Sequence, residues 1–339
     1  MLSENILKME GICKAFPGVR ALHNVDFALR KGEIHALMGE NGAGKSTLIK
    51  VITGVYEKDA GRIALNKRPI HFKSPQEAQN SGIGTVYQEI PLCPNLTVAE
   101  NMFIGRGRNA FVQWKQMNAK ATQMLDSLGI QASPTQELSS CSLAVQQMIA
   151  IARAVDMDCK ILILDEPTSS LDEDEVKKLF ELMRELKARG VGIIFITHFI
   201  EQVYKISDRI TVLRNGELIG EYETSSLPQI ELISKMMGKA LDDAAKIKKH
   251  KPPKSDSSVP VFEAAALSSA AGVRPFNFTI QKGEVNGFAG LIGSGRSESA
   301  RVIFAADKVT GGEIRMKGKR VKIKTPLHAL KQGIGYLPE

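Results

Sequence analysis

Continuous apolar runs in the chain predict strands that are buried on both faces. They are EIHALMGE at 33–40, ILIL at 161–164 and GIIFI at 192–196. The absence of polar alternation is typical of parallel strands covered by helices on either side. The runs are also far shorter than the ~20 residues of a membrane-spanning helix. We therefore expect an α/β protein with a mainly parallel sheet.

Apolar residues at helical spacing predict helices next to these strands. A glycine-rich stretch follows the first run, and the apolar positions after it predict a helix over 46–56. Another helix is expected from Asp172, as its N-cap, to Gly190, where it ends. Residues 97–155 lack strand patterns, which indicates a helical insert beside the sheet.

The opening part of the chain recurs at a fixed offset. Gly61 and Gly312, and likewise Pro75 and Pro326, are 251 positions apart, and no gap is needed between these points. A constant spacing over such a length indicates two copies of one fold.

Three segments are therefore expected. The first copy is predicted over residues 5–240, a linker over 241–258, and an incomplete second copy, only the opening third of the fold, over 259–339. The linker contains KIKKHKPPK at 246–254, whose composition is typical of a solvated connection, with polyanion binding as the alternative.

Composition changes this picture little. The chain has 45 basic and 37 acidic residues, a net charge of +8, and 43% hydrophobic residues, as in ordinary globular proteins. We infer no nucleic-acid partner from this charge. The four cysteines form no CxxC pair, and the start MLSENILKMEG has no basic leader, so we expect a cytoplasmic location.

The stretch that follows the first apolar run matches the phosphate-loop pattern GxxxxGK[ST]. Its backbone N–H groups would curl around phosphate oxygens at a helix N-terminus. Lys45 would neutralise the β- and γ-phosphates, and the Ser46 hydroxyl would bind Mg²⁺. The predicted ATP-binding residues of this loop are Gly39, Glu40, Asn41, Gly42, Ala43, Gly44, Lys45, Ser46 and Thr47.

Two carboxylates end the second apolar run, in ILILDEP. Asp165 would hold Mg²⁺ through water, and Glu166 would orient and polarise the attacking water. The alternative is an acidic strand end that only caps a helix. A phosphate loop in the same chain favours the catalytic interpretation.

With these motifs, the whole chain resembles the ATPase domains of ABC transporters. The resemblance implies that Gln88, in VYQE, contacts Mg²⁺ or the lytic water and transmits motion to membrane subunits. It implies that His198, in FITH, contacts the γ-phosphate and that Asp172, in SSLD, lies at the dimer seam. It also implies that Phe16 stacks on adenine, although a core aromatic is the alternative there.

Finer features resemble sugar importers of the ribose, galactose and xylose type, which join two ATPase domains in one polypeptide. The segment HFIEQVYKISDRITVLRNG is similar to galactofuranose importer ATPases in particular. The resemblance implies transmembrane sugar permease subunits as partners and, indirectly, a periplasmic sugar-binding protein. It also implies a peripheral place on the cytoplasmic side of the inner membrane.

Two motifs depart from the family pattern. The signature LSGGQ is replaced by CSLAV at 141–145, which keeps Ser142 but loses both glycines; a simple helix cap by this serine is the alternative. The second copy has a degenerate phosphate loop with an arginine in place of lysine. The residues of that loop are Gly290, Gly295, Arg296 and Ser297.

We therefore predict a P-loop ATPase of the ABC type, with a mainly parallel core, an antiparallel β edge and a helical subdomain, that hydrolyses ATP to energise sugar import. One alternative is an ATP-binding remnant with little turnover, because the second copy is incomplete. The other is a soluble ABC protein of translation or DNA repair, although the charged helical linker or coiled-coil insertion of such proteins is missing here.

Overall fold

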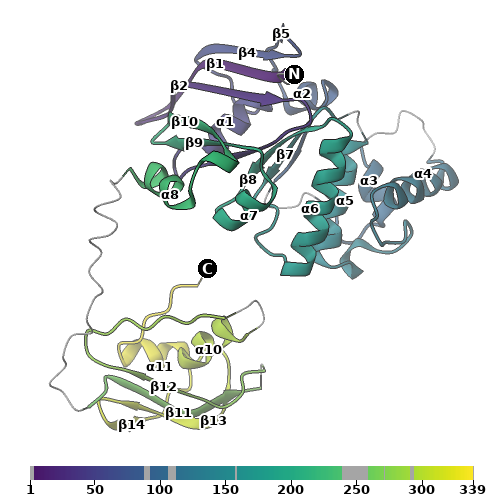
Figure 1. The fold of residues 1–339 in the computed structure, drawn as a ribbon. Helices are drawn as coiled ribbons and strands as arrows, with labels where there is room; N and C mark the ends of the chain where they lie inside the picture. The colour runs from purple at the N-terminus through teal and green to yellow at the C-terminus, as the bar shows by residue number, and fades with distance from the viewer. Residues whose placement is uncertain are drawn as a thin grey trace. The chain divides into compact units, whose positions relative to one another are not determined.

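The structure is a computed structural model, and it describes residues 4–87, 92–105, 112–156, 159–238, 259–270, 272–290 and 294–338 (Figure 1). The chain forms two compact units, Met1–Ala245 and Lys246–Glu339, which we call unit 1 and unit 2. Among the described helices, none combines the length and the apolar character that crossing a bilayer requires. Gln88 lies outside the described residues.

A four-stranded antiparallel sheet opens unit 1. Strands β1 (Asn5–Phe16) and β2 (Val19–Arg30) form one long hairpin, and β4 (Ala60–Leu65) pairs with the other side of β1. The short β5 (Arg68–Pro69) completes the order β2-β1-β4-β5. Gly61 lies so close to β1 that a Cβ there would be 2.5 Å from the Gly11 carbonyl oxygen, so no side chain fits.

A second sheet of six strands is mainly parallel. Its order is β10-β9-β3-β8-β7-β6, with an antiparallel β9–β10 pair at one edge and parallel pairing elsewhere. The strands are β3 (Ile34–Met38), β6 (Ile83–Val86), β7 (Ile161–Asp165), β8 (Gly192–Ile196), β9 (Arg209–Arg214) and β10 (Glu217–Glu223).

Helices cover both faces of this sheet, as the continuous apolar runs predict. Helices α1 (Lys45–Ile52) and α2 (Pro75–Asn80) alternate with β3, β4 and β6 along the chain. Helices α3 (Val98–Phe103), α4 (Trp114–Ser127) and α5 (Leu143–Val155) gather at one side of the unit (Figure 1). The later helices are α6 (Glu173–Ala188), α7 (Ile200–Ile206) and α8 (Gln229–Met237), and the 3₁₀ turns are η1 (Leu138–Ser140) and η2 (Thr224–Ser226).

The side chains of β7 show how the two faces are filled. Ile161 and Ile163 belong to a core shared with the antiparallel sheet and α1. Leu162 and Leu164 belong to a separate core with α3, α4, α5 and α6. Successive residues of a strand point to opposite faces, so one uninterrupted apolar run serves two cores. The mainly parallel core, antiparallel edge and helical subdomain are confirmed.

One sequence expectation was wrong. The helix predicted over 46–56 ends at Ile52, because Thr53 caps its C-terminus and Gly54 turns the chain with φ 71°. Val55, which was counted on its apolar face, is 42% exposed instead. A glycine just after the last helical turn is a common stop signal.

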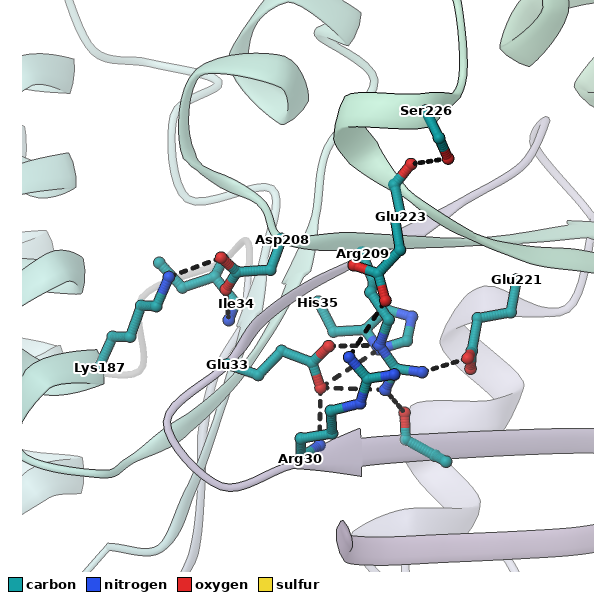
Figure 2. A network of polar contacts seen from close by, with 11 residues as sticks. Arg30, Glu33, Ile34, His35, Lys187, Asp208, Arg209, Glu221, Glu223 and Ser226 are labelled. Carbon is teal, nitrogen blue, oxygen red and sulfur yellow. Dashed lines mark hydrogen bonds and ion pairs between the residues drawn. The ribbon is translucent and has the colours of Figure 1, made fainter. Parts of the chain in front are cut away.

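A buried polar network joins the two sheets of unit 1 (Figure 2). Arg209, at the start of β9, donates hydrogen bonds to the Glu33 carboxylate, to Glu221 of β10 and, at 3.0 Å, to the Ala28 carbonyl oxygen of β2. Glu33 also accepts from the Arg30 backbone N–H at 2.6 Å. Arg209 and Glu33 are both nearly inaccessible to solvent, so the pair depends on these mutual bonds.

Unit 2 has its own antiparallel sheet, with the order β12-β11-β13-β14. The strands are β11 (Phe262–Ser269), β12 (Phe276–Ile280), β13 (Val309–Met316) and β14 (Lys319–Val321), and the helices are α10 (Arg296–Ile303) and α11 (Pro326–Lys331). Helices α10 and α11 have the bounds of α1 and α2 displaced by 251 positions. Gly312 meets the β11 backbone as Gly61 meets β1, with a carbonyl oxygen 2.5 Å from a Cβ built there.

Unit 2 lacks the parallel sheet in its described part. Residues 285–289, which correspond to β3, form no strand, and Val285 is 96% exposed. In unit 1, β3 pairs with β8 and β9. The described residues of unit 2 contain no counterparts of those strands, so this segment has no backbone partners.

Candidate functional site

The predicted phosphate loop lies between a fully buried strand and a helix. β3 ends at Met38, and α1 begins at Lys45 with Gly44 as its N-cap at φ 103°. A Cβ on Gly44 would lie 2.7 Å from the Ala21 carbonyl oxygen. A Cβ on Gly39 would lie 2.3 Å from the Leu213 carbonyl oxygen. Close backbone packing therefore requires glycine at both Gly39 and Gly44. The backbone N–H groups of the loop lie at the start of α1.

Lys45 folds back over this loop. Its Nζ donates to the carbonyl oxygens of Gly39 and Glu40 at 2.7 and 3.0 Å. Ser46, on the first turn of α1, is exposed. An ammonium group held by two neutral carbonyls can exchange them for phosphate oxygens, which bind it more strongly.

The two carboxylates lie at the carboxyl end of β7. Since β3, β8 and β7 are parallel neighbours, their carboxyl ends meet at one edge of the sheet, where ligands bind in open α/β folds. Glu166 is held in the left-handed backbone region at φ 50°, and its N–H donates to the Ile196 carbonyl oxygen at 3.0 Å. A glutamate in that region is strained, which is characteristic of functional positions.

Lys45 interacts electrostatically with both acids. Burial raises the pKa of Asp165, and the adjacent Glu166 raises it further, while Lys45 acts in the opposite direction. Burial lowers the pKa of Lys45, against the pull of Glu166 and Asp165. The centre thus holds two acids and one nearby cation in a half-buried place, which favours an additional positive charge.

His198 completes the cluster. Its Nδ1 lies 2.8 Å from Glu166 Oε2, and its ring packs on Phe199 with centroids 4.0 Å apart. The structure therefore brings together four predicted site residues from three segments. They are Lys45, Asp165, Glu166 and His198.

Two other predicted residues cap helices. Ser142 is the N-cap of α5 and accepts from the Val145 N–H at 3.4 Å, as the structural alternative proposed. Asp172 is the N-cap of α6 and forms a capping box with Glu175. The signature role of Ser142 and the place of Asp172 at the dimer seam stay predictions.

Phe16, at the end of β1, is half-buried and lies beside another aromatic ring. Its ring meets Tyr56 edge-on at 5.1 Å, and the Lys14 ammonium is 5.6 Å from its centroid. These contacts are with the protein's own side chains, so adenine stacking remains a prediction for Phe16.

Sequence reasoning missed a contact next to this cluster. Thr168, two residues after Glu166, donates a 2.6 Å hydrogen bond to the Gln202 side-chain oxygen on α7. The partners are 34 positions apart, and neither belongs to a recognisable pattern, so the sequence contains no signal for the pairing.

The second loop repeats part of this geometry. Gly295 is the N-cap of α10 at φ 88°, and Arg296 is its first residue, as Gly44 and Lys45 are for α1. Arg296 and Ser297 are exposed. The strand that precedes the first loop has no counterpart before the second.

Comparison with known proteins identifies the family. The sequence profile described as "ABC transporter" matches residues 22–169 and 273–339. The chain belongs to the ABC transporter family. It is 49% identical over 338 residues to the galactofuranose transporter ATP-binding protein of Escherichia coli (strain K12), which covers 99% of this chain and 67% of that relative. It is 47% identical over 339 residues to the fructose import ATP-binding protein of Bifidobacterium longum, with 98% and 66% covered.

Solved structures agree with this ABC assignment. The ADP conformation of an ATP-binding cassette from an ABC transporter matches with a TM-score of 0.62 at 27% identity, covering 72% of this chain and 99% of that one. A nucleotide-free cassette matches with a TM-score of 0.59 at 30% identity, covering 65% and 92%. The chain is therefore an ABC-type ATPase that binds ATP, and both the fold class and the family resemblance are confirmed.

Proposed function

We propose that this ABC ATPase energises the import of a monosaccharide, with galactofuranose as the first candidate. The observation that carries the proposal is the meeting of Lys45, Glu166 and His198 at the carboxyl edge of one parallel sheet. The 49% identity with a galactofuranose transporter ATP-binding protein supports the substrate. The 47% identity with a fructose import ATP-binding protein makes other monosaccharides candidates too, so the test includes them.

Hydrolysis requires two rearrangements of the present contacts. Lys45 leaves the Gly39 and Glu40 carbonyl oxygens and neutralises the β- and γ-phosphates. Glu166 leaves His198 and accepts a proton from water as that water attacks the γ-phosphorus. The bond from phosphorus to the bridging oxygen breaks, ADP leaves, and His198 contacts the γ-phosphate. Charge neutralisation and positioning suffice, without a covalent intermediate.

The site fits Mg²⁺ as a companion of ATP. Asp165 and Ser46 supply the carboxylate and hydroxyl oxygens that this ion prefers, and Gln88 is the third proposed contact. Burial and Glu166 raise the pKa of Asp165 more than Lys45 lowers it, so an added positive charge would stabilise the ionised carboxylates. Bound Mg²⁺ would neutralise charge on the phosphates.

We assign the remaining predicted residues supporting roles. Phe16 stacks on adenine, Asp172 lies at the seam between two ATPase domains, and Ser142 belongs to the signature that approaches a nucleotide on the opposite domain. Leu143, where the family has glycine, is 52% exposed and would weaken that approach.

The degenerate loop of the second copy would bind nucleotide without efficient turnover. Its residues are Gly290, Gly295, Arg296 and Ser297. Arg296 keeps a positive charge, but its planar guanidinium does not reproduce a lysine point charge.

A role in sugar import implies partner proteins and a location for this subunit. The permease subunits would span the membrane, a periplasmic sugar-binding protein would deliver the sugar, and this subunit would sit on the cytoplasmic side. Residues 5–240, 241–258 and 259–339 would be the first domain, the linker and the part of the second domain in this chain.

The test is transport in proteoliposomes that contain the chain, its cognate sugar permease and the corresponding binding protein. ATP-dependent uptake of labelled galactofuranose, with fructose, ribose and galactose measured in parallel, is the expected result. Glu166→Gln is the matched control and abolishes uptake. ATP hydrolysis that no sugar stimulates, with no uptake of any of the four, would overturn the proposal.

A further inference from the structure

Two side-chain bonds connect the segment after β7 to the segment after β8. One is the exposed contact of Glu166 with His198, in which the histidine side chain is 63% exposed. The other joins Thr168, which is 2% exposed, to the half-buried Gln202. The bonds are offset by two residues in the first segment and by four in the second, so they form consecutive rungs between the same two loops.

The exposed rung cannot persist through the proposed reaction. Glu166 must turn to water, and His198 must turn to the γ-phosphate, so each gives up the other. The buried rung uses neither a reacting group nor an ATP-binding residue. It can therefore stay closed while the exposed rung opens.

Gln202 is well placed to transmit this constraint to His198. It lies in the first turn of α7, where its N–H donates to the Phe199 carbonyl oxygen at 3.0 Å. Phe199, the N-cap, provides no side-chain cap, and its own N–H donates to Thr197 Oγ1 at 3.1 Å. A bond to Gln202 thus holds the beginning of α7, four residues beyond His198.

Other contacts keep α7 folded without this bond. Val203 is buried in a core with β9 and α8, and Ile206 is buried in the separate core that includes α5 and α6. Loss of one hydroxyl group at Thr168 therefore leaves the helix anchored from its other side. Its first turn, however, loses its side-chain attachment to the loop that carries Glu166.

We propose that Thr168 and Gln202 are positioning residues, which hold the His198 segment in register with Glu166 while these two exchange partners during hydrolysis. The inference rests on the proposed ATPase mechanism. It predicts an effect on turnover and little effect on nucleotide affinity, because the phosphate loop belongs to β3 and α1.

The test compares Thr168→Val, which keeps the shape and removes the hydroxyl, with Thr168→Ser, which keeps the hydroxyl. ATPase kinetics are measured on the full chain assembled with its permease. Loss of a neutral hydrogen bond is expected to lower kcat about three- to tenfold in Thr168→Val, with KM for ATP within about twofold of wild type. Thr168→Ser restores kcat, and Gln202→Leu combined with Thr168→Val lowers it no further.

A matched control separates positioning from general stability. Thr211 is a buried threonine, 1% exposed, whose hydroxyl bonds a side chain elsewhere, His35 Nε2 at 2.7 Å. Thr211→Val lowers the unfolding midpoint and leaves kcat unchanged.

The outcomes distinguish this inference from the proposed function. A Thr168→Val kcat equal to wild type, beside a Glu166→Gln variant that no longer hydrolyses ATP, overturns the positioning role and leaves the ATPase mechanism standing. An equal loss of kcat in Thr168→Val and Thr211→Val also overturns it. Full hydrolysis by Glu166→Gln overturns the mechanism on which the inference rests.

Discussion

Replacing Glu33 with glutamine is expected to destabilise unit 1 by about 3 kcal/mol at pH 7. Burial would raise the pKa of Glu33, but interactions with His35 and Arg209 outweigh it and lower the pKa from 4.5 to about 2. At ~1.4 kcal/mol for each tenfold change in proton affinity, this difference corresponds to about 3 kcal/mol. The same magnitude, ~3–5 kcal/mol, is typical of breaking a buried ion pair from one side.

The pH dependence makes this prediction specific. Because the folded-state pKa is depressed, the stabilisation is complete above pH ~5 and is lost as the pH falls toward 2. The gap in unfolding free energy between wild type and Glu33→Gln should therefore shrink from about 3 kcal/mol at pH 7 to about 1 kcal/mol at pH 3. Carboxylates remote from this network cancel in this difference.

Urea denaturation at the two pH values measures the gap. Fluorescence of Trp114, the one tryptophan of the chain, follows unit 1 separately from unit 2. Glu10→Gln is the matched control, because Glu10 pairs with Lys8 on the surface, and it should leave the midpoint unchanged. A gap that stays constant from pH 7 to pH 3 would refute an ionised, paired Glu33 in the folded state.

Two further predictions concern the nucleotide site, and a third concerns the N-cap of α6. Mg-ATP at 100 times its dissociation constant should stabilise the fold by ~2.7 kcal/mol, and an unchanged melting temperature contradicts binding. Glu166→Gln should keep ATP affinity and lower kcat by roughly 10²- to 10⁴-fold; near-normal turnover excludes Glu166 as the base. Asp172→Ala should lower stability by ~1 kcal/mol through loss of the α6 cap, with the exposed Asp174→Ala as control, and equal melting temperatures contradict the capping role.

The sequence predicted most of the strands and helices and the phosphate loop. Continuous apolar runs identified β3, β7 and β8, since burial on both faces removes polar alternation. Glycine and lysine in a fixed pattern identified the phosphate loop, because its geometry excludes other residues at Gly39 and Gly44. The end of α1 was misjudged because the apolar Val55 continued a pattern that Gly54 had already interrupted.

What the sequence did not reveal are pairings across long separations. Glu33 and Arg209 are 176 positions apart, and nothing local marks either as a partner of the other. The segment at 285–289 resembles β3 in pattern but forms no strand, since strand formation depends on neighbours that the described part of unit 2 does not contain.

The contiguity of the antiparallel sheet has a consequence for synthesis of the chain. Strands β1, β2, β4 and β5 all lie within residues 5–69, whereas β3 pairs Ile34 with Ile193 and Ala36 with Ile210. Contacts of short sequence separation form before distant ones, and chains emerge from the ribosome from the N-terminus. A nascent chain can thus form its first sheet before the partner strands of β3 have been synthesised. The chain would become able to bind ATP only after β9 has been made.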